Sequence, residues 1–147
     1  MHPLYRHCES TTTMSSSAEV SRHLVKSVVC ALFWRRMNDE PALLENIKKL
    51  VQARKYRIRL HAVRHMIEEG FDERDLLEAL GGKSRILERY SNEMRCLILG
   101  YFTLTERLRI PLHVVCDYSN PTLVDIITAY VPQKPWWITP AKRGRLT

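Results

Sequence analysis

The sequence predicts an α+β fold, with N-terminal helices packed on a four-stranded antiparallel sheet. Apolar residues recur at helical spacing as far as Gly81-Gly82, whereas every apolar run after Lys83 has the length and alternation of a strand. Short polar links separate these runs, which favours antiparallel neighbours. Because the helices precede the sheet instead of alternating with it, the order indicates α+β architecture.

The first expected helix of this domain starts near Asp39, a residue that caps helices, and Pro41 suits its first turn. Its apolar residues form a single stripe that can face a core. They are Leu43, Leu44, Ile47, Leu50 and Val51.

Two further helices are expected before the sheet. His61 to Glu69 has helical composition and ends at Gly70, which suits a left-handed cap. Asp72 starts the next helix, and Gly81-Gly82 ends it. Ahead of both, Tyr56 to Leu60 alternates and predicts a short strand or an extended lead-in.

Four strands are expected after the helices: Arg85 to Tyr90, Arg95 to Thr103, Ile110 to Asp117 and Leu123 to Val131. The second is apolar on both faces, which predicts a central position with both faces covered. One of its faces carries Cys96, Ile98, Gly100 and Phe102, and the other carries Leu97, Leu99 and Tyr101.

The composition divides the chain into three parts. Residues 37–137 are expected to form the folded domain. Residues 1–36 carry Ser and Thr tracts and predict a disordered or partly helical basic extension, and residues 138–147 predict a basic C-terminal tail. Trp136 and Trp137 are expected to pack on the domain.

Charge indicates the kind of partner. With 23 Lys and Arg against 16 Asp and Glu, the net charge of +7 favours an anionic partner such as RNA, DNA or an acidic protein. The longest apolar run, Val28 to Trp34, is far shorter than a membrane span, so we expect a cytoplasmic protein without a membrane partner. The four cysteines form no C-x-x-C pair, and we expect no metal and no cofactor.

Several separated motifs carry a family resemblance. They are His61-Ala62-x-x-His65-Met66-Ile67-Glu68-Glu69-Gly70-Phe71, Pro111-Leu112-His113-Val114-Val115, Ile126-Ile127-Thr128-Ala129-Tyr130-Val131-Pro132, and then Trp137. Together the segment from Leu43 to Trp137 resembles the bacterial family catalogued as domain of unknown function 4258. The resemblance implies a RelE-like fold, the helix-then-sheet scaffold of many toxin ribonucleases, and a small zinc-finger antitoxin as a partner.

Metal-independent RNA cleavage needs a base for the 2′-hydroxyl proton, an acid for the leaving oxygen and a cation for the phosphate. Histidine suits the first two roles at neutral pH. We therefore expect a catalytic site in which His61, Arg95, His113 and Tyr130 share one face of the sheet.

Structural roles for the histidines remain open at this point. His61 could cap its helix, and His65 is read as a solvated or half-buried residue on the helix face. By alternation, His113 points with Val115 and Asp117, which places it either under the helices or in an exposed cleft.

Arginines suit phosphate binding because the guanidinium group is planar and permanently charged. Those expected to contact RNA are Arg64, Arg85, Arg89 and Arg109. The function that we expect is that of a toxin-like, metal-independent ribonuclease of a toxin–antitoxin pair. The alternative is a non-catalytic module of the same fold that binds RNA or protein.

Overall fold

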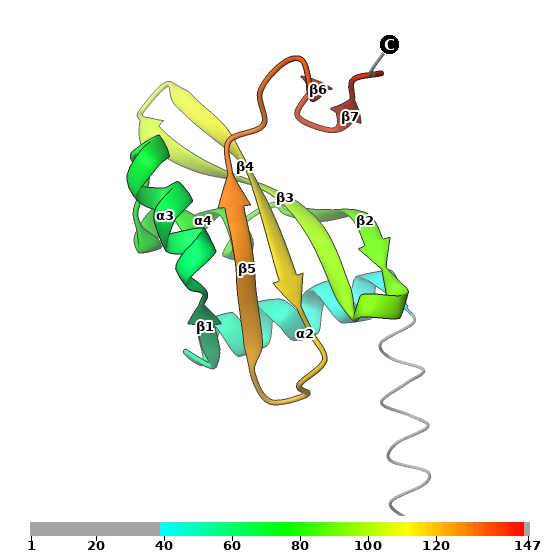
Figure 1. Cartoon of the computed structure of the whole chain (residues 1–147). Coiled ribbons are helices and arrows are strands. Elements are labelled where there is room, and N and C mark those ends of the chain that lie inside the picture. Colours follow the sequence, from blue (N-terminus) through cyan, green and yellow to red (C-terminus); the bar gives the residue numbers. More distant parts are fainter. Residues whose placement is uncertain (1–38, 146–147) are drawn as a thin grey trace, which may run out of the picture. The chain divides into compact units, whose positions relative to one another are not determined.

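The computed structural model describes residues 39–145, so the expected extension at residues 1–36 lies outside the described residues. The elements from Glu40 onward belong to one compact unit. They are α2 (Glu40–Gln52), β1 (Tyr56–Ile58), α3 (Leu60–Glu69), α4 (Glu73–Gly81), β2 (Arg85–Tyr90), the 3-10 turn η1 (Ser91–Glu93), β3 (Arg95–Thr105), β4 (Leu108–Asp117), β5 (Val124–Tyr130), β6 (Trp137–Thr139) and β7 (Lys142–Arg143) (Figure 1).

The three helices of this unit lie where the sequence predicts them. α3 ends at Gly70, whose φ of 76° is left-handed and whose N–H donates to the carbonyl of Met66. α4 begins with a reciprocal capping box between Asp72 and Asp75. These local signals therefore fix both ends of the turn that joins α3 to α4.

The sheet differs from the expected four antiparallel strands. It has five strands in the order β1-β5-β4-β3-β2, and β1 pairs with β5 in parallel. The four-stranded antiparallel prediction is therefore wrong in strand number and in direction at one edge. The segment at Tyr56–Ile58 is only three residues long, and its partner strand lies far along the chain. No local pattern reveals such a pairing.

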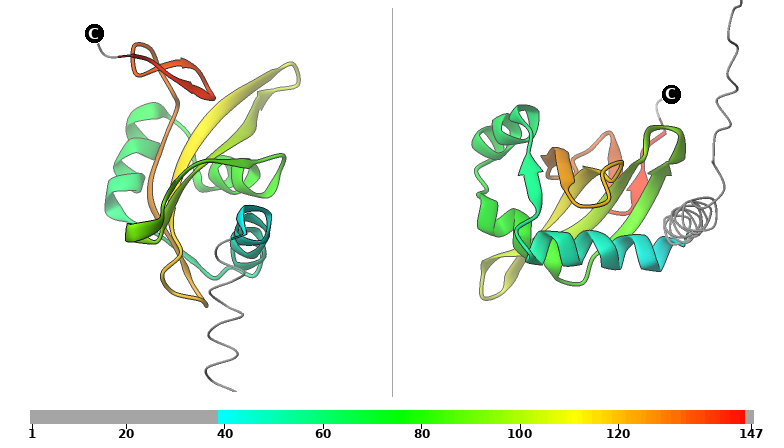
Figure 2. Two further views of the ribbon diagram at one scale, coloured as in Figure 1. Left: turned by 90° about the vertical axis from the view of Figure 1, so that its right-hand side faces the viewer. Right: turned by 90° about the horizontal axis from the view of Figure 1, so that it is seen from below.

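One face of the sheet is packed against helices α2 and α4, whereas α3 lies beside β5 (Figure 2). Paired positions such as Ile98 and Val114 point to the face covered by α2 and α4. At Gly100 the backbone of α4 comes so close that an added Cβ would lie 2.0 Å from the carbonyl oxygen of Ala79. Glycine at this position allows α4 to pack directly on β3.

The opposite face is called the open face below, because none of the helices within residues 39–145 lies over its β2, β3 and β4 (Figure 1). Its upper part is covered instead by the C-terminal hairpin, which consists of β6 and β7. Trp137 at the start of β6 is 5% exposed, whereas Trp136 beside it is 60% exposed. Only one of the two tryptophans packs as expected, and the strands of the hairpin extend into residues 138–147, where we expected a tail.

A bulge in β2 determines which side chains reach the open face. Ile86 pairs with Ile98 on the helix-covered face, and the register then shifts so that Glu88 pairs with Leu97. In a regular ladder Glu88 would oppose Cys96 and point toward the helices. The extra residue turns Glu88 and the later Tyr90 toward the open face, where the hairpin lies.

The close approach at Gly100 yields a prediction. Gly100→Ala should lower the free energy of unfolding by about 1–3 kcal/mol, because α4 must shift away from β3. Gly81→Ala is the matched control, since an added Cβ there meets nothing within 4 Å. Urea denaturation of both variants checks this, and equal stability of Gly100→Ala and the native protein would contradict the packing.

Candidate functional site: a pocket under the C-terminal hairpin

His113 joins the sheet to the hairpin. It is fully buried, and its Nε2 lies 2.6 Å from the carbonyl oxygen of Pro140, between β6 and β7. A carbonyl only accepts, so Nε2 carries the proton. Nδ1 then accepts from the hydroxyl of Tyr130, 3.3 Å away. The edge of Trp137 completes the enclosure, with its ring centroid 4.3 Å from that of His113.

This environment holds His113 in its neutral form. Burial lowers its pKa below the ordinary value, and this effect outweighs the hydrogen bond to Pro140 and the charge of Glu88. Both ring nitrogens already have partners. The arrangement therefore makes His113 a residue that positions the hairpin.

An ion pair anchors the second strand of the hairpin. The guanidinium of Arg143 bonds both carboxylate oxygens of Glu88, with NH2 2.8 Å from Oε2, and it lies over the ring of Trp137. The hydroxyl of Tyr90 donates to the same carboxylate. Arg143 lowers the pKa of Glu88, and burial raises the pKa of Tyr90 to about 12. Glu88 thus remains a carboxylate that binds the hairpin.

The hairpin encloses a pocket between itself, α3 and the end of β5. Its volume is about 380 Å³, within the usual range for small-molecule sites. This C-terminal pocket is lined by His65, Glu69, Tyr130, Val131, Gln133, Trp136, Trp137 and Arg143. Aromatic rings, one histidine and one guanidinium therefore face a common space.

His65 and Glu69 form an oriented pair on α3. The Nδ1 of His65 lies 3.3 Å from Oε1 of Glu69, and the N–H of Val131 donates to Oε2 at 2.6 Å. Because a carboxylate only accepts, this contact requires a proton on Nδ1 and leaves Nε2 as the basic nitrogen. The side chain of His65 is 31% exposed. An imidazole oriented by a carboxylate is the arrangement that general-base catalysis uses.

Tyr130 links the pocket to the buried histidine. Its hydroxyl contacts His113, and its ring meets the imidazole at 72° with a centroid distance of 5.2 Å. Burial raises the pKa of Tyr130, so the phenol keeps its proton at neutral pH. The pocket therefore contains one group able to accept a proton and one able to donate a proton.

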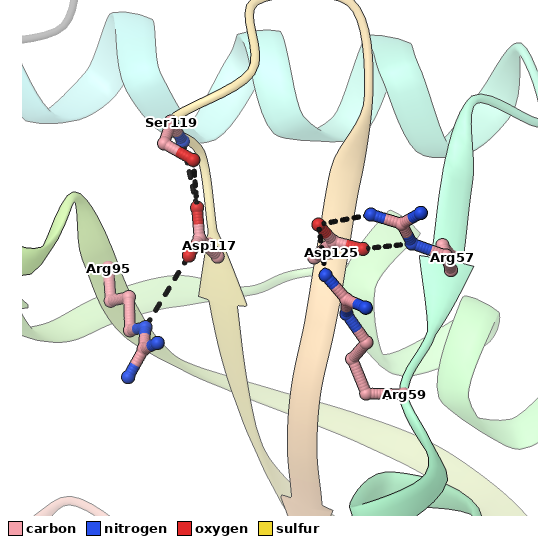
Figure 3. Close-up of polar contacts among 6 residues, drawn as sticks. All are labelled: Arg57, Arg59, Arg95, Asp117, Ser119 and Asp125. Carbon is pink, nitrogen blue, oxygen red and sulfur yellow. Dashed lines mark hydrogen bonds and ion pairs between the residues drawn. The ribbon is translucent and has the colours of Figure 1, made fainter.

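A second polar cluster lies at the other end of the open face (Figure 3). Asp125 on β5 accepts from Arg57 Nε at 2.6 Å and from Arg59 NH2 at 3.2 Å, and these arginines lower its pKa. Asp117 pairs in register with Asp125 and bonds Arg95 at 3.5 Å. Each carboxylate is therefore balanced by at least one guanidinium.

The structure brings together two of the four expected catalytic residues, His113 and Tyr130. Arg95 is the first residue of β3 and binds Asp117 and Glu93. It lies four residues before Leu99, the partner of His113, or roughly 13 Å along the strand. His61 is exposed on α3, with its ring 4.8 Å from that of His65. The side chains of His61 and Arg95 do not line the C-terminal pocket.

The arginines expected to contact RNA are spread over several elements. Arg64 on α3 and Arg85 on β2 are exposed. Arg109 is exposed near the β3–β4 turn, with its guanidinium 5.7 Å from the ring centre of Tyr101. Arg89 belongs to the helix-covered side of β2, where its NH2 lies 3.5 Å from the hydroxyl of Tyr118.

The sequence reasoning gave His65 and Glu69 no chemical role. Trp136 and Arg143 belong to an aromatic and basic C-terminal segment that suits RNA or an antitoxin, but their position beside His65 was not predicted. One signal was available, since His65 and Glu69 are four residues apart on a helix and so share a face. The position of Arg143 had no local signal, because its partner Glu88 lies 55 residues away. Among residues 39–145, no group of three or more His, Cys, Asp or Glu side chains could hold a metal ion.

A comparison with protein families matches residues 58–131, half of the chain, to the family described as a domain of unknown function (DUF4258). The chain belongs to this family. The match runs from the last residue of β1 to the end of β5 and so includes His65, Glu69 and Tyr130, whereas the C-terminal hairpin follows it. No curated protein and no solved structure matches the chain. Within the described part of this DUF4258 protein, no helix has the length and apolar character of a membrane span.

Burial of His113 predicts a pH dependence of stability. Its folded-state pKa is lowered, so the unfolded chain takes up the proton first as the pH falls below the ordinary value of about 6.5. The stability contributed by neutral His113 is complete above that pH and declines below it. The difference between the unfolding free energies at about pH 7.5 and about pH 5.5 should therefore be smaller in His113→Gln than in the native protein. An unchanged difference between the two pH values would contradict this role.

Proposed function

We propose that this protein is a toxin-like, metal-independent ribonuclease that cleaves single-stranded RNA in the C-terminal pocket. The observation that carries the proposal is the His65–Glu69 pair, which presents a basic imidazole nitrogen beside aromatic rings and Arg143. The RelE-like fold and bacterial origin implied by the family resemblance belong to the same proposal, and so does the cytoplasmic location expected from the short apolar runs. The net charge of +7 supports an anionic substrate.

The chemistry follows from the proton positions. Nε2 of His65 takes the proton of a ribose 2′-hydroxyl, and the 2′-oxygen then attacks the adjacent phosphorus. The hydroxyl of Tyr130 turns from Nδ1 of His113 and gives its proton to the 5′-oxygen as the bond from phosphorus to that oxygen breaks. The products are a 2′,3′-cyclic phosphate and a free 5′-hydroxyl. His65 then releases the proton it took to water, and the phenol of Tyr130 regains a proton from water.

Substrate binding uses the other surfaces of the pocket. Trp136 is 60% exposed and offers a flat face on which an unpaired base can stack. Arg143 donates to Glu88 through Nε and NH2, and an arginine has further donors for a phosphate oxygen. A pocket of about 380 Å³ suits one nucleotide better than a duplex.

Regulation by a small zinc-finger antitoxin is the further part of this proposal, and it derives from the family resemblance alone. Such a partner would inhibit the enzyme by covering the C-terminal pocket. The second candidate is a non-catalytic RNA- or protein-binding module. One observation favours it: Glu88 already neutralises Arg143, the arginine that lines the pocket, which weakens its use as the cation of a cleavage site.

Replacement of His65 tests the catalytic proposal. His65→Gln should slow cleavage of single-stranded RNA by roughly 10²–10⁴-fold, the usual contribution of a general base. His61→Gln is the matched control, because His61 lies one turn away on α3 and does not line the pocket. Gel analysis of a labelled oligoribonucleotide measures both rates.

Two results would count against this assignment. Equal cleavage by the native protein and His65→Gln would remove His65 from the mechanism. Binding of RNA by the native protein without any cleavage would favour the non-catalytic module. Circular dichroism should show that both variants keep the native fold.

A further inference from the structure

A basic segment leads along one edge of the fold to the C-terminal pocket. Residues 53–67 contain five Lys or Arg side chains and no Asp or Glu. The segment covers the turn after α2, the edge strand β1 and most of α3, and it reaches His65 in the pocket. The five side chains, called the basic edge below, are Arg54, Lys55, Arg57, Arg59 and Arg64, and all belong to exposed residues.

The cluster at Asp125 directs two of these side chains over the open face. Arg57 and Arg59 point across β5 toward the same carboxylate (Figure 3), although their side chains remain 53% and 49% exposed. The Asp125 side chain is only 13% exposed. Two guanidinium groups share one carboxylate, so the group formed by Arg57, Arg59 and Asp125 carries a net positive charge.

The spacing suits a single strand of nucleic acid. β1 and the first two turns of α3 place the arginine cluster about 15 Å from His65, at the rises of a strand and a helix. A strand held in the pocket therefore needs only a few more nucleotides to reach Arg57 and Arg59. Guanidinium groups bind phosphates of any sequence, which suits contacts to a backbone.

We propose that the basic edge is a second RNA subsite, which binds the phosphates of the strand flanking the nucleotide in the C-terminal pocket. This inference rests on the proposed function, since it takes that pocket as the place of the cleaved nucleotide. Its occupant is single-stranded RNA, because the patch is positively charged and the adjoining pocket has an exposed tryptophan.

The test compares short and long ligands. Single-stranded oligonucleotides with 2′-O-methyl groups bind without being cut, because the 2′-oxygen has no proton to lose. A trinucleotide with its central nucleotide in the pocket extends by one nucleotide on each side and stops short of Arg57 and Arg59, whereas a dodecanucleotide reaches them. Arg57→Gln/Arg59→Gln should weaken dodecanucleotide binding roughly tenfold at low salt and reduce the salt slope of log K by about 1.4, at about 0.7 per phosphate contact. Trinucleotide affinity should not change.

Two further variants make the result specific. Lys83→Gln/Arg107→Gln removes the same charge from exposed turns outside the basic edge and should leave dodecanucleotide binding within about twofold of native. Asp125→Asn removes the carboxylate that competes for Arg57 and Arg59, so it should strengthen dodecanucleotide binding. Because the expected result for Asp125→Asn is tighter binding, a loss of folding cannot produce it.

The outcomes separate the inference from the proposed function. If the trinucleotide binds but the dodecanucleotide gains nothing from the basic edge, and Asp125→Asn has no effect, the second subsite is overturned while the pocket stands. If Lys83→Gln/Arg107→Gln weakens dodecanucleotide binding equally, the second subsite is also overturned, because the affinity would then depend only on the overall charge of the protein. If the native protein binds neither ligand, the proposed function and this inference both fail.

Discussion

The contact of His113 with Pro140 is the interaction on which the pocket depends. It ties the middle of β4 to a hairpin that comes after the last strand of the sheet. None of the described helices lies over this part of the open face, and the hairpin covers His113 there through Pro140 and Trp137. The pair of Glu88 and Arg143 adds a second attachment. Without these attachments, Tyr130 and the His65–Glu69 pair would line an open sheet edge instead of a pocket.

The polar groups around the C-terminal pocket are of two kinds. His113 and Glu88 are satisfied by fixed partners, and their shifted pKa values reflect that fixed environment. The side chain of His65 is partly exposed and lines a space that ligands can enter. This division explains why the buried histidine is assigned a positioning role and the half-exposed one a chemical role.

Much of the fold could be predicted because its signals are local. Gly70 and Asp72 mark helix ends through their own backbone preferences, and alternation along Arg95 to Thr103 separates the two faces of β3. The features that were missed depend on distant partners. β1 is held by a parallel strand 68 residues away, and Glu88 reaches the open face only because of a bulge. The expected catalytic site differs from the C-terminal pocket for the same reason, because the sequence predicts a tail where most of the hairpin lies.

Binding at the pocket is the most direct test of this account. In an amide and indole NMR spectrum of the native protein, a single-stranded RNA trinucleotide with 2′-O-methyl groups should shift the indole signal of Trp136 and the backbone signals of Val131 and Gln133. Signals around Arg109, near the β3–β4 turn, should stay in place. Shifts confined to that turn, or no shifts at saturating ligand, would contradict the claim that the hairpin and α3 form an RNA site.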